Sequence, residues 1–176
     1  MLTNGPKLGI VSIACLRRCV LTYLNQSLGF DEVRWATTRK TSYDSLVAFA
    51  GNPVKQALPV GVRLFRLLRL ATGAYFDGVW WMPEDVFTEL QNDAKGSGRL
   101  FRNYVAQFMA LPSGNSQLCV VEIELTKQVY GWVGKSSPLF GRPGGMEQVF
   151  LPNLQDRDYP RSSLHAKVVR TYWLKF

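Results

Sequence analysis

Cysteine, histidine and long apolar runs are scarce in this chain of 176 residues, and each scarcity excludes a class of protein. The three cysteines are an odd number and form no CxxC pair, which argues against a disulfide framework and against a zinc knuckle. Cys15 and Cys19 are four residues apart, a helical spacing that is typical of two small buried side chains. We therefore expect the protein to act in a reducing compartment.

The one histidine, His165, leaves almost no material for His-based catalytic triads or His-rich metal sites. The chain also has no GxxxxGK[ST] loop, so a Walker-type nucleotide site is not expected. We expect no bound metal.

The longest apolar run near the start, residues 8–16, has nine residues, whereas a bilayer span needs about 20. Arg17 and Arg18 follow this run, although a signal peptide carries its charges before the apolar stretch. We expect an amphipathic helix packed on the protein body and no membrane partner.

Positive charge is present in excess and is unevenly distributed. The chain has 21 Lys and Arg against 13 Asp and Glu, and 47% of its residues are hydrophobic. Its length suffices for one domain, or for one domain with an appendage. Residues 1–70 hold ten basic and three acidic residues, and the rest of the chain holds eleven and ten. The early basic residues predict either a solvated face or a surface for RNA, DNA or an acidic partner. They are Arg17, Arg18, Arg34, Arg39 and Lys40.

The hydrophobic pattern predicts helices early in the chain and strands late, and hence an α+β fold. Apolar residues at three- and four-residue steps predict a helix over 13–29, and a second helix is expected from residue 41 or 42 to Gly51. Further helices are expected from Pro83 onward and over 98–111. Strands are expected over 62–68, 79–82, 118–125, 128–133, 148–151 and 166–174.

The most informative stretch is 130–152, where two expected strands flank a loop rich in glycine and proline. Phe140 and Arg142 lie in this loop, and Glu147 and Gln148 open the second strand. One interpretation is an ordinary long hairpin loop whose glycines supply positive φ angles. The other is a binding site, because a carboxylate and an amide stand at a strand mouth beside an aromatic, glycine-rich loop.

The order of these elements resembles the ADP-ribosyltransferase-like superfamily, in particular its bacterial toxins and their NAD-hydrolysing relatives. The family's first strand carries Leu-Tyr-Arg or similar, which looks like residues 64–66, and its second carries an aromatic pair, similar to Trp80 and Trp81. A late Gly-Gly loop then leads into a strand with the decisive Glu or Gln, which looks like residues 144–150. The resemblance covers about residues 58–152 and includes the loop of residues 137–145.

The resemblance implies a split β-sheet core at 58–176, preceded by a basic helical region at 1–57. It implies NAD as substrate, with Glu147 or Gln148 as the catalytic residue and Arg66 on the pyrophosphate. The flat nicotinamide would lie on an aromatic ring, and Arg142 would contact a phosphate or the target. The aromatic candidates are Tyr75, Trp80, Trp81 and Phe140.

Two positions depart from the family pattern. Met82 stands where Ser or Thr is expected, and Gly145 stands where members that modify proteins usually have Glu or Gln. The register is therefore open, and Gln148 in the catalytic role would favour NAD hydrolysis over transfer.

The resemblance leads us to expect a toxin that cleaves the nicotinamide–ribose bond and transfers ADP-ribose to a protein or nucleic acid. Such a toxin would be secreted or delivered, would act in the target-cell cytoplasm, and would have an immunity protein. The alternatives are an NAD glycohydrolase toxin and a non-catalytic basic nucleic-acid-binding domain.

Overall fold

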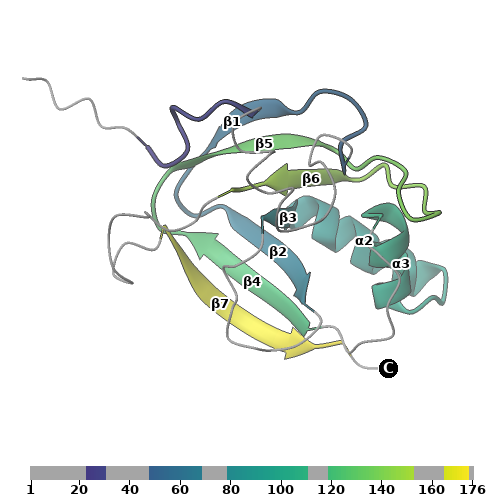
Figure 1. Ribbon diagram of the computed structural model, residues 1–176. Coiled ribbons are helices and arrows are strands. Elements are labelled where there is room, and N and C mark those ends of the chain that lie inside the picture. The colour runs from purple at the N-terminus through teal and green to yellow at the C-terminus, as the bar shows by residue number, and fades with distance from the viewer. Residues whose placement is uncertain (1–22, 31–47, 69–78, 111–118, 153–164, 175–176) are drawn as a thin grey trace, which may run out of the picture.

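A computed structural model describes residues 23–30, 48–68, 79–110, 119–152 and 165–174 (Figure 1). Within these ranges it has seven strands and two helices, α2 (Glu84–Gly96) and α3 (Phe101–Phe108). The strands are β1 (Val54–Leu58), β2 (Arg63–Leu68), β3 (Trp80–Pro83), β4 (Cys119–Leu125), β5 (Val129–Lys135), β6 (Glu147–Phe150) and β7 (Ala166–Trp173). In the described part of the chain, no helix is long and apolar enough to cross a membrane.

All seven strands form one antiparallel sheet in the order β1-β5-β6-β3-β2-β4-β7. The short strand β3 joins the two halves of this sheet: Trp80 and Trp81 pair with β6, whereas Met82 and Pro83 pair with β2. The sheet curls into a half-barrel, and α2 and α3 lie together on one side of it (Figure 1). The α+β class expected from the sequence agrees with this architecture.

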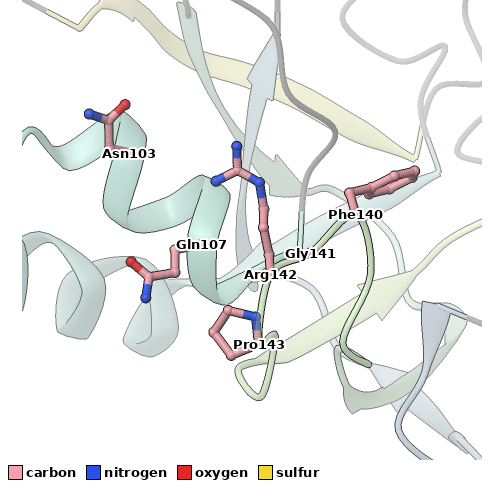
Figure 2. Close-up of a pocket in the computed structure, with 6 residues that line it drawn as sticks. All are labelled: Asn103, Gln107, Phe140, Gly141, Arg142 and Pro143. Carbon is pink, nitrogen blue, oxygen red and sulfur yellow. The ribbon is translucent and has the colours of Figure 1, made fainter.

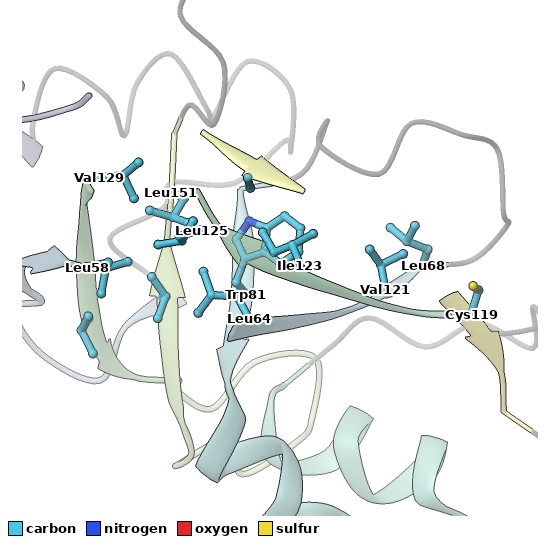
Figure 3. Packing of buried hydrophobic residues seen from close by; sticks show 13 residues of the cluster. Leu58, Leu64, Leu68, Trp81, Cys119, Val121, Ile123, Leu125, Val129 and Leu151 are labelled. Atoms are coloured by element: carbon cyan, nitrogen blue, oxygen red, sulfur yellow. The ribbon is translucent and has the colours of Figure 1, made fainter. Parts of the chain in front are cut away.

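The inner face of the half-barrel holds the largest group of buried side chains (Figure 3). Alternate residues of each strand supply it, as period-2 side-chain geometry requires. Trp81 lies at its centre and is 1% exposed. Its other members are Leu58, Leu64, Leu68, Cys119, Val121, Ile123, Leu125, Val129, Val133, Val149, Leu151 and Ala166.

The two helices cover the other face of β2, β3 and β4. Phe65 and Met82 project to this face and pack with Phe87 of α2 and Val105 of α3. Pro83 precedes α2, and Glu84 and Asp85 occupy its first turn, where carboxylates are favoured by the helix dipole. Both helices were predicted, with bounds that differ by one to three residues at each end that the sequence specified.

The N-terminal segment (residues 23–30) packs on the outer face of β5 and β6 through Leu28 and Phe30, whereas its Leu24 packs against the inner core. The ring of Phe30 lies 5.7 Å from that of Trp132 and 5.8 Å from that of Phe150, measured between centroids. Lys55 of β1 holds the segment in place, because its Nζ donates hydrogen bonds of 2.6 Å to the backbone carbonyls of Gln26 and Leu28.

The helix expected over 13–29 is wrong in its described part. Leu24 forms a β-bridge with Val129, and Asn25 has φ 64°, a left-handed conformation that ends a helix. The helix expected to reach Gly51 does not include Phe49, which bridges Ser136 instead. Residues 1–22 and 41–47, where these two helices would begin, lie outside the described ranges.

Strand β1 was not predicted. It pairs with β5 along its whole length, so the division expected between residues 57 and 58 falls inside a strand of the sheet. The half-barrel therefore begins before residue 58.

At the other edge of the sheet, an ion-paired carboxylate joins β7 to β4. Glu122 is 1% exposed, and its carboxylate contacts the Arg170 guanidinium and lies 3.4 Å from Arg63 Nη1. A buried carboxylate needs such partners because removal from water otherwise strongly disfavours its charge.

Candidate active site

Arg66 projects from β2 onto the inner face of the half-barrel. It stands between Leu64 and Leu68, which both belong to the inner core, and it pairs across the sheet with Val121 of β4. The register of β2 with β3 places Trp81 on its other side. The guanidinium carbon of Arg66 lies 5.8 Å from the centroid of the Trp81 ring, within the range of a cation–π contact.

Trp81 therefore supports Arg66 and presents no open ring face. At 1% exposure it cannot also provide the surface for nicotinamide that the resemblance implied. Its indole nitrogen is buried and has no hydrogen-bond acceptor among the described residues. A buried donor of this kind is rare in a folded protein and calls for an explanation.

Trp80 lies on the opposite face of β3, as alternation along a strand requires. Its ring packs 5.3 Å from Phe49 and 4.9 Å from Phe150, in the cluster that the N-terminal segment covers. It is separated from Arg66 by the sheet itself. Tyr75, the remaining aromatic candidate on this part of the chain, lies outside the described residues.

Glu147 and Gln148 have different environments. Gln148 is 5% exposed, and its Nε2 donates a 2.7 Å hydrogen bond to the carbonyl of Ala48. Glu147 is exposed at the first position of β6, opposite Lys135 of β5. The amide is thus engaged in packing, while the carboxylate is available to a ligand.

Arg66, Trp81 and Glu147 share one face of three adjacent strands. Trp81 pairs with Val149, and Glu147 is two residues from Val149 on the same strand, hence on the same face. Arg66 and Glu147 are then two strands and two residues apart. With about 4.8 Å between strands and about 3.4 Å per residue, a flat sheet would place their Cα atoms about 12 Å apart.

The loop between β5 and β6 (residues 136–146) contains a tight two-residue turn. Leu139 and Arg142 exchange backbone hydrogen bonds of 3.1 and 2.9 Å, and the central residues Phe140 and Gly141 have φ angles of 55° and 71°. Two positive φ angles define a type I′ turn, which normally has Asn or Gly at its first central position. Phe140 occupies that position with 49% of its surface exposed.

This loop is fastened to the C-terminal end of α3, whose last carbonyls have no partner within the helix. The backbone N–H of Gly144 donates to the carbonyl of Gln107, at 3.3 Å. The carbonyl of Phe108 accepts from the Ser136 hydroxyl at 2.8 Å and from the Met146 N–H at 3.4 Å. These three bonds fix the position of the loop against the helix.

An open pocket of about 440 Å³ lies between this loop and α3 (Figure 2). Figure 2 shows Arg142 standing between the helix and Phe140. We call it the α3–loop pocket; its lining consists of Asn103, Gln107, Phe140, Gly141, Arg142 and Pro143. Phe140 and Arg142 thus lie beside α3, which packs on the opposite face of the sheet from Arg66.

Asn103 and Gln107 were not among the predicted site residues. The apolar side chains of α3 predicted the helix itself. The sequence signal that could have indicated a site on its polar side is the pair of amides one helical turn apart. The basic residues expected to form a surface, Arg17, Arg18, Arg34, Arg39 and Lys40, lie outside the described ranges. Among described residues, no three His, Cys, Asp or Glu side chains are grouped so that they could hold a metal ion.

Comparison with known proteins finds no matching family model and no matching curated protein. Six chains of solved structures align with this chain, among them the following two. "Rhs1-CT in complex with cognate immunity protein RhsI1" aligns over 70% of this chain and 82% of that one, with 14% identity and a TM-score of 0.47. "Structure of Tne2 in complex with Tni2" aligns over 72% and 97%, with 17% identity and a TM-score of 0.48. TM-scores below 0.5 support no inference about activity or partners.

Proposed function

We propose that this protein is an NAD-cleaving effector domain that transfers ADP-ribose to a macromolecule. Its catalytic residue is Glu147, and Arg66 binds the pyrophosphate. The observation that carries the proposal is the projection of Arg66 and Glu147 from one face of β2 and β6, on either side of β3. The sequence resemblance to ADP-ribosyltransferase-like proteins supports it.

The chemistry of the bond explains why these two side chains suit the task. Cleavage of the nicotinamide–ribose bond passes through an oxocarbenium-like state with positive charge at the anomeric carbon. A carboxylate that accepts a hydrogen bond from a ribose hydroxyl orients the sugar and favours that charge. The pyrophosphate has two negative charges, and a guanidinium binds such groups in a planar, bidentate manner.

Trp81 contributes by holding Arg66. The contact between its ring and the guanidinium limits the orientations of a long side chain before any ligand arrives. We therefore assign Trp81 a positioning role.

Burial favours Glu147 over Gln148 for the catalytic role. Gln148 is bonded to Ala48 in the interior, so it is not free to hold a ribose, and the exposed carboxylate of Glu147 takes the role. With Glu147 in the role, the glutamine that would favour hydrolysis does not occupy it, and transfer is the first candidate. Hydrolysis remains the second candidate for one reason: Gly145, where protein-modifying relatives have Glu or Gln, offers no side chain to an acceptor.

The test is to incubate the protein with NAD labelled in its adenine half, with and without cell lysate. Transfer predicts label in the macromolecular fraction, and digestion with protease, RNase or DNase then identifies the acceptor class. Nicotinamide release without lysate and without retained label would support hydrolysis. If NAD stays intact in both conditions while salt-sensitive binding to nucleic acid is observed, the enzyme proposal is wrong and the non-catalytic domain stands.

Glu147→Gln should lower turnover by a factor of about 100 or more, the scale of losing one transition-state contact. Glu89→Gln is the matched control, because Glu89 is an exposed carboxylate on α2, away from the inner face. Full activity in Glu147→Gln would dismiss the site. We further propose that the chain acts as a delivered toxin with an immunity partner. Its expression in the cytoplasm of a host cell should then arrest the growth of that cell, and Glu147→Gln should relieve the arrest.

A further inference from the structure

The α3–loop pocket combines three kinds of side chain: carboxamides, a guanidinium and an aromatic ring. Asn103 and Gln107 project from successive turns of α3 and offer both hydrogen-bond donors and acceptors. Arg142 offers a guanidinium, and Phe140 offers an aromatic ring that is 49% exposed. The described lining contains no carboxylate, so nothing in it repels an anion.

The pocket walls are fixed relative to each other. Gln107 accepts a hydrogen bond from Gly144 of the loop, and the Leu139–Arg142 bonds hold the turn that carries Phe140. Phe140 adopts a left-handed backbone conformation that a bulky residue rarely takes, and such positions occur preferentially at ligand-binding sites. A wall that is rigid before binding loses less entropy when a ligand enters.

These groups match the parts of a nucleotide. Carboxamides pair with the donor–acceptor edge of a base, aromatic side chains stack on its face, and a guanidinium binds its phosphate. A volume of about 440 Å³ falls within the usual range for small-ligand sites, roughly 300–1,000 Å³. The chain's net charge of +8 would also draw a polyanion towards it.

We propose that the α3–loop pocket binds a nucleotide, with Asn103 and Gln107 on the base edge, Phe140 stacked on the base and Arg142 on the phosphate. This goes beyond the proposed function, because binding requires no cleavage of NAD. The nucleotide can come from a single-stranded nucleic-acid acceptor or from NAD itself. The pocket borders the loop that leads into β6 and lies beside α3, on the opposite face of the sheet from Arg66.

The experiment measures binding to the full chain carrying Glu147→Gln, which keeps the result independent of turnover. The probes are a fluorescein-labelled single-stranded RNA of eight nucleotides, followed by anisotropy, and AMP, NAD and an acidic decapeptide, followed by calorimetry. The double variant Asn103→Ala, Gln107→Ala should weaken nucleotide binding about tenfold or more. Arg142→Gln should weaken RNA binding and lower the slope of log affinity against log salt by about one.

The matched control is the double variant Gln91→Ala, Asn92→Ala, which removes the same two amides from an exposed part of α2 and should leave binding unchanged. Pocket-dependent binding of RNA supports the proposal with a nucleic-acid acceptor as the source. Pocket-dependent binding of AMP and NAD but not of RNA supports it with the dinucleotide as the source. Equal affinities in all variants, binding of the peptide alone, or no binding of any probe would overturn it.

Discussion

Replacing Gly144 with alanine tests whether the loop between β5 and β6 is seated on α3 as the structure shows. Gly144 has φ 65°, and a Cβ built there would lie 2.5 Å from the carbonyl oxygen of Ser137 and 2.6 Å from that of Ser136. Backbone atoms at such distances must move. Because Gly144 N–H also donates to Gln107, any shift of the loop breaks one of the bonds that fasten it to the helix.

Gly141 provides a control with almost the same backbone angle. Its φ is 71°, but an added Cβ meets no described atom within 4 Å. Both substitutions therefore carry the left-handed backbone cost of about 1 kcal/mol or slightly more. Only Gly144→Ala adds the steric cost, which overpacking measurements put at about 1–3 kcal/mol. We expect a loss of about 1 kcal/mol for Gly141→Ala and about 3 kcal/mol for Gly144→Ala.

Urea unfolding and thermal unfolding both measure this difference. For a protein of this size, about 2 kcal/mol corresponds to a separation of about 4–8 °C between the two melting temperatures. Gly144→Ala should also lose nucleotide binding by the α3–loop pocket, because the loop carries three of its lining side chains. Equal destabilisation by the two alanines would show that Gly144 is not confined by the Ser136 and Ser137 carbonyls, and would refute the packing of the loop.

Three further predictions test other parts of the structure. Lys55→Met keeps the aliphatic stem but removes two charge-assisted hydrogen bonds to the N-terminal segment, so the free energy of unfolding in urea should fall by about 2 kcal/mol. Lys127→Met, at an exposed position, should leave the free energy of unfolding unchanged. An unchanged free energy in Lys55→Met would contradict the role of Lys55 in holding the N-terminal segment. Phe140→Asn places a residue that readily adopts positive φ in the type I′ turn, so the melting temperature should stay the same or rise. A clear fall in the melting temperature would disprove the turn. A hydrogen bond from Lys167 lowers the pKa of Glu124 below its ordinary 4.5, so the unfolded chain binds this proton more readily than the folded one. The stability that the carboxylate contributes is therefore present above about pH 4.5 and is lost as the pH falls through the lowered pKa. In acid unfolding curves, Glu124→Gln should lose less stability over this pH range than the unaltered protein does. Identical curves would refute the interaction.

The strands that could be predicted from the sequence are those with a distinct apolar face. In β4 the apolar residues Val121, Ile123 and Leu125 alternate with Glu122 and Glu124, and the expected bounds differ from the observed ones by one residue at the start of the strand. Strand β1 has no such pattern, because it lies at the sheet edge and all its side chains except Leu58 are exposed or half-buried. Only its pairing with β5 defines it as a strand, and an alternating pattern of apolar and polar residues within one segment does not reveal which strand it pairs with.

The helix predicted over 13–29 fails at its described end for a related reason. Leu24 and Leu28 stand four residues apart, as in a helix, yet they contact the sheet from an irregular segment. The contacts come from the bridge to Val129 and from the carbonyls that Lys55 holds. Apolar spacing reports which side chains face the core, and a non-helical chain lying across a sheet can produce the same spacing.

The candidate site left two pairs of alternatives open in the sequence, Trp80 or Trp81 and Glu147 or Gln148. In the structure the two choices are linked by the register of β3 with β6, because Trp81 pairs with Val149 and Trp80 pairs with Phe150. Period-2 geometry then places Glu147 with Trp81 on the inner face and Gln148 with Trp80 on the outer face. Because a slip of one residue between β3 and β6 would exchange the partners, no local pattern in either strand could decide the matter. Arg66 lies on the same face as Trp81, so under the proposed function Glu147 is the one of these two residues that can act on a substrate bound by this guanidinium. A measured requirement for Gln148 instead would mean that the substrate does not meet Arg66.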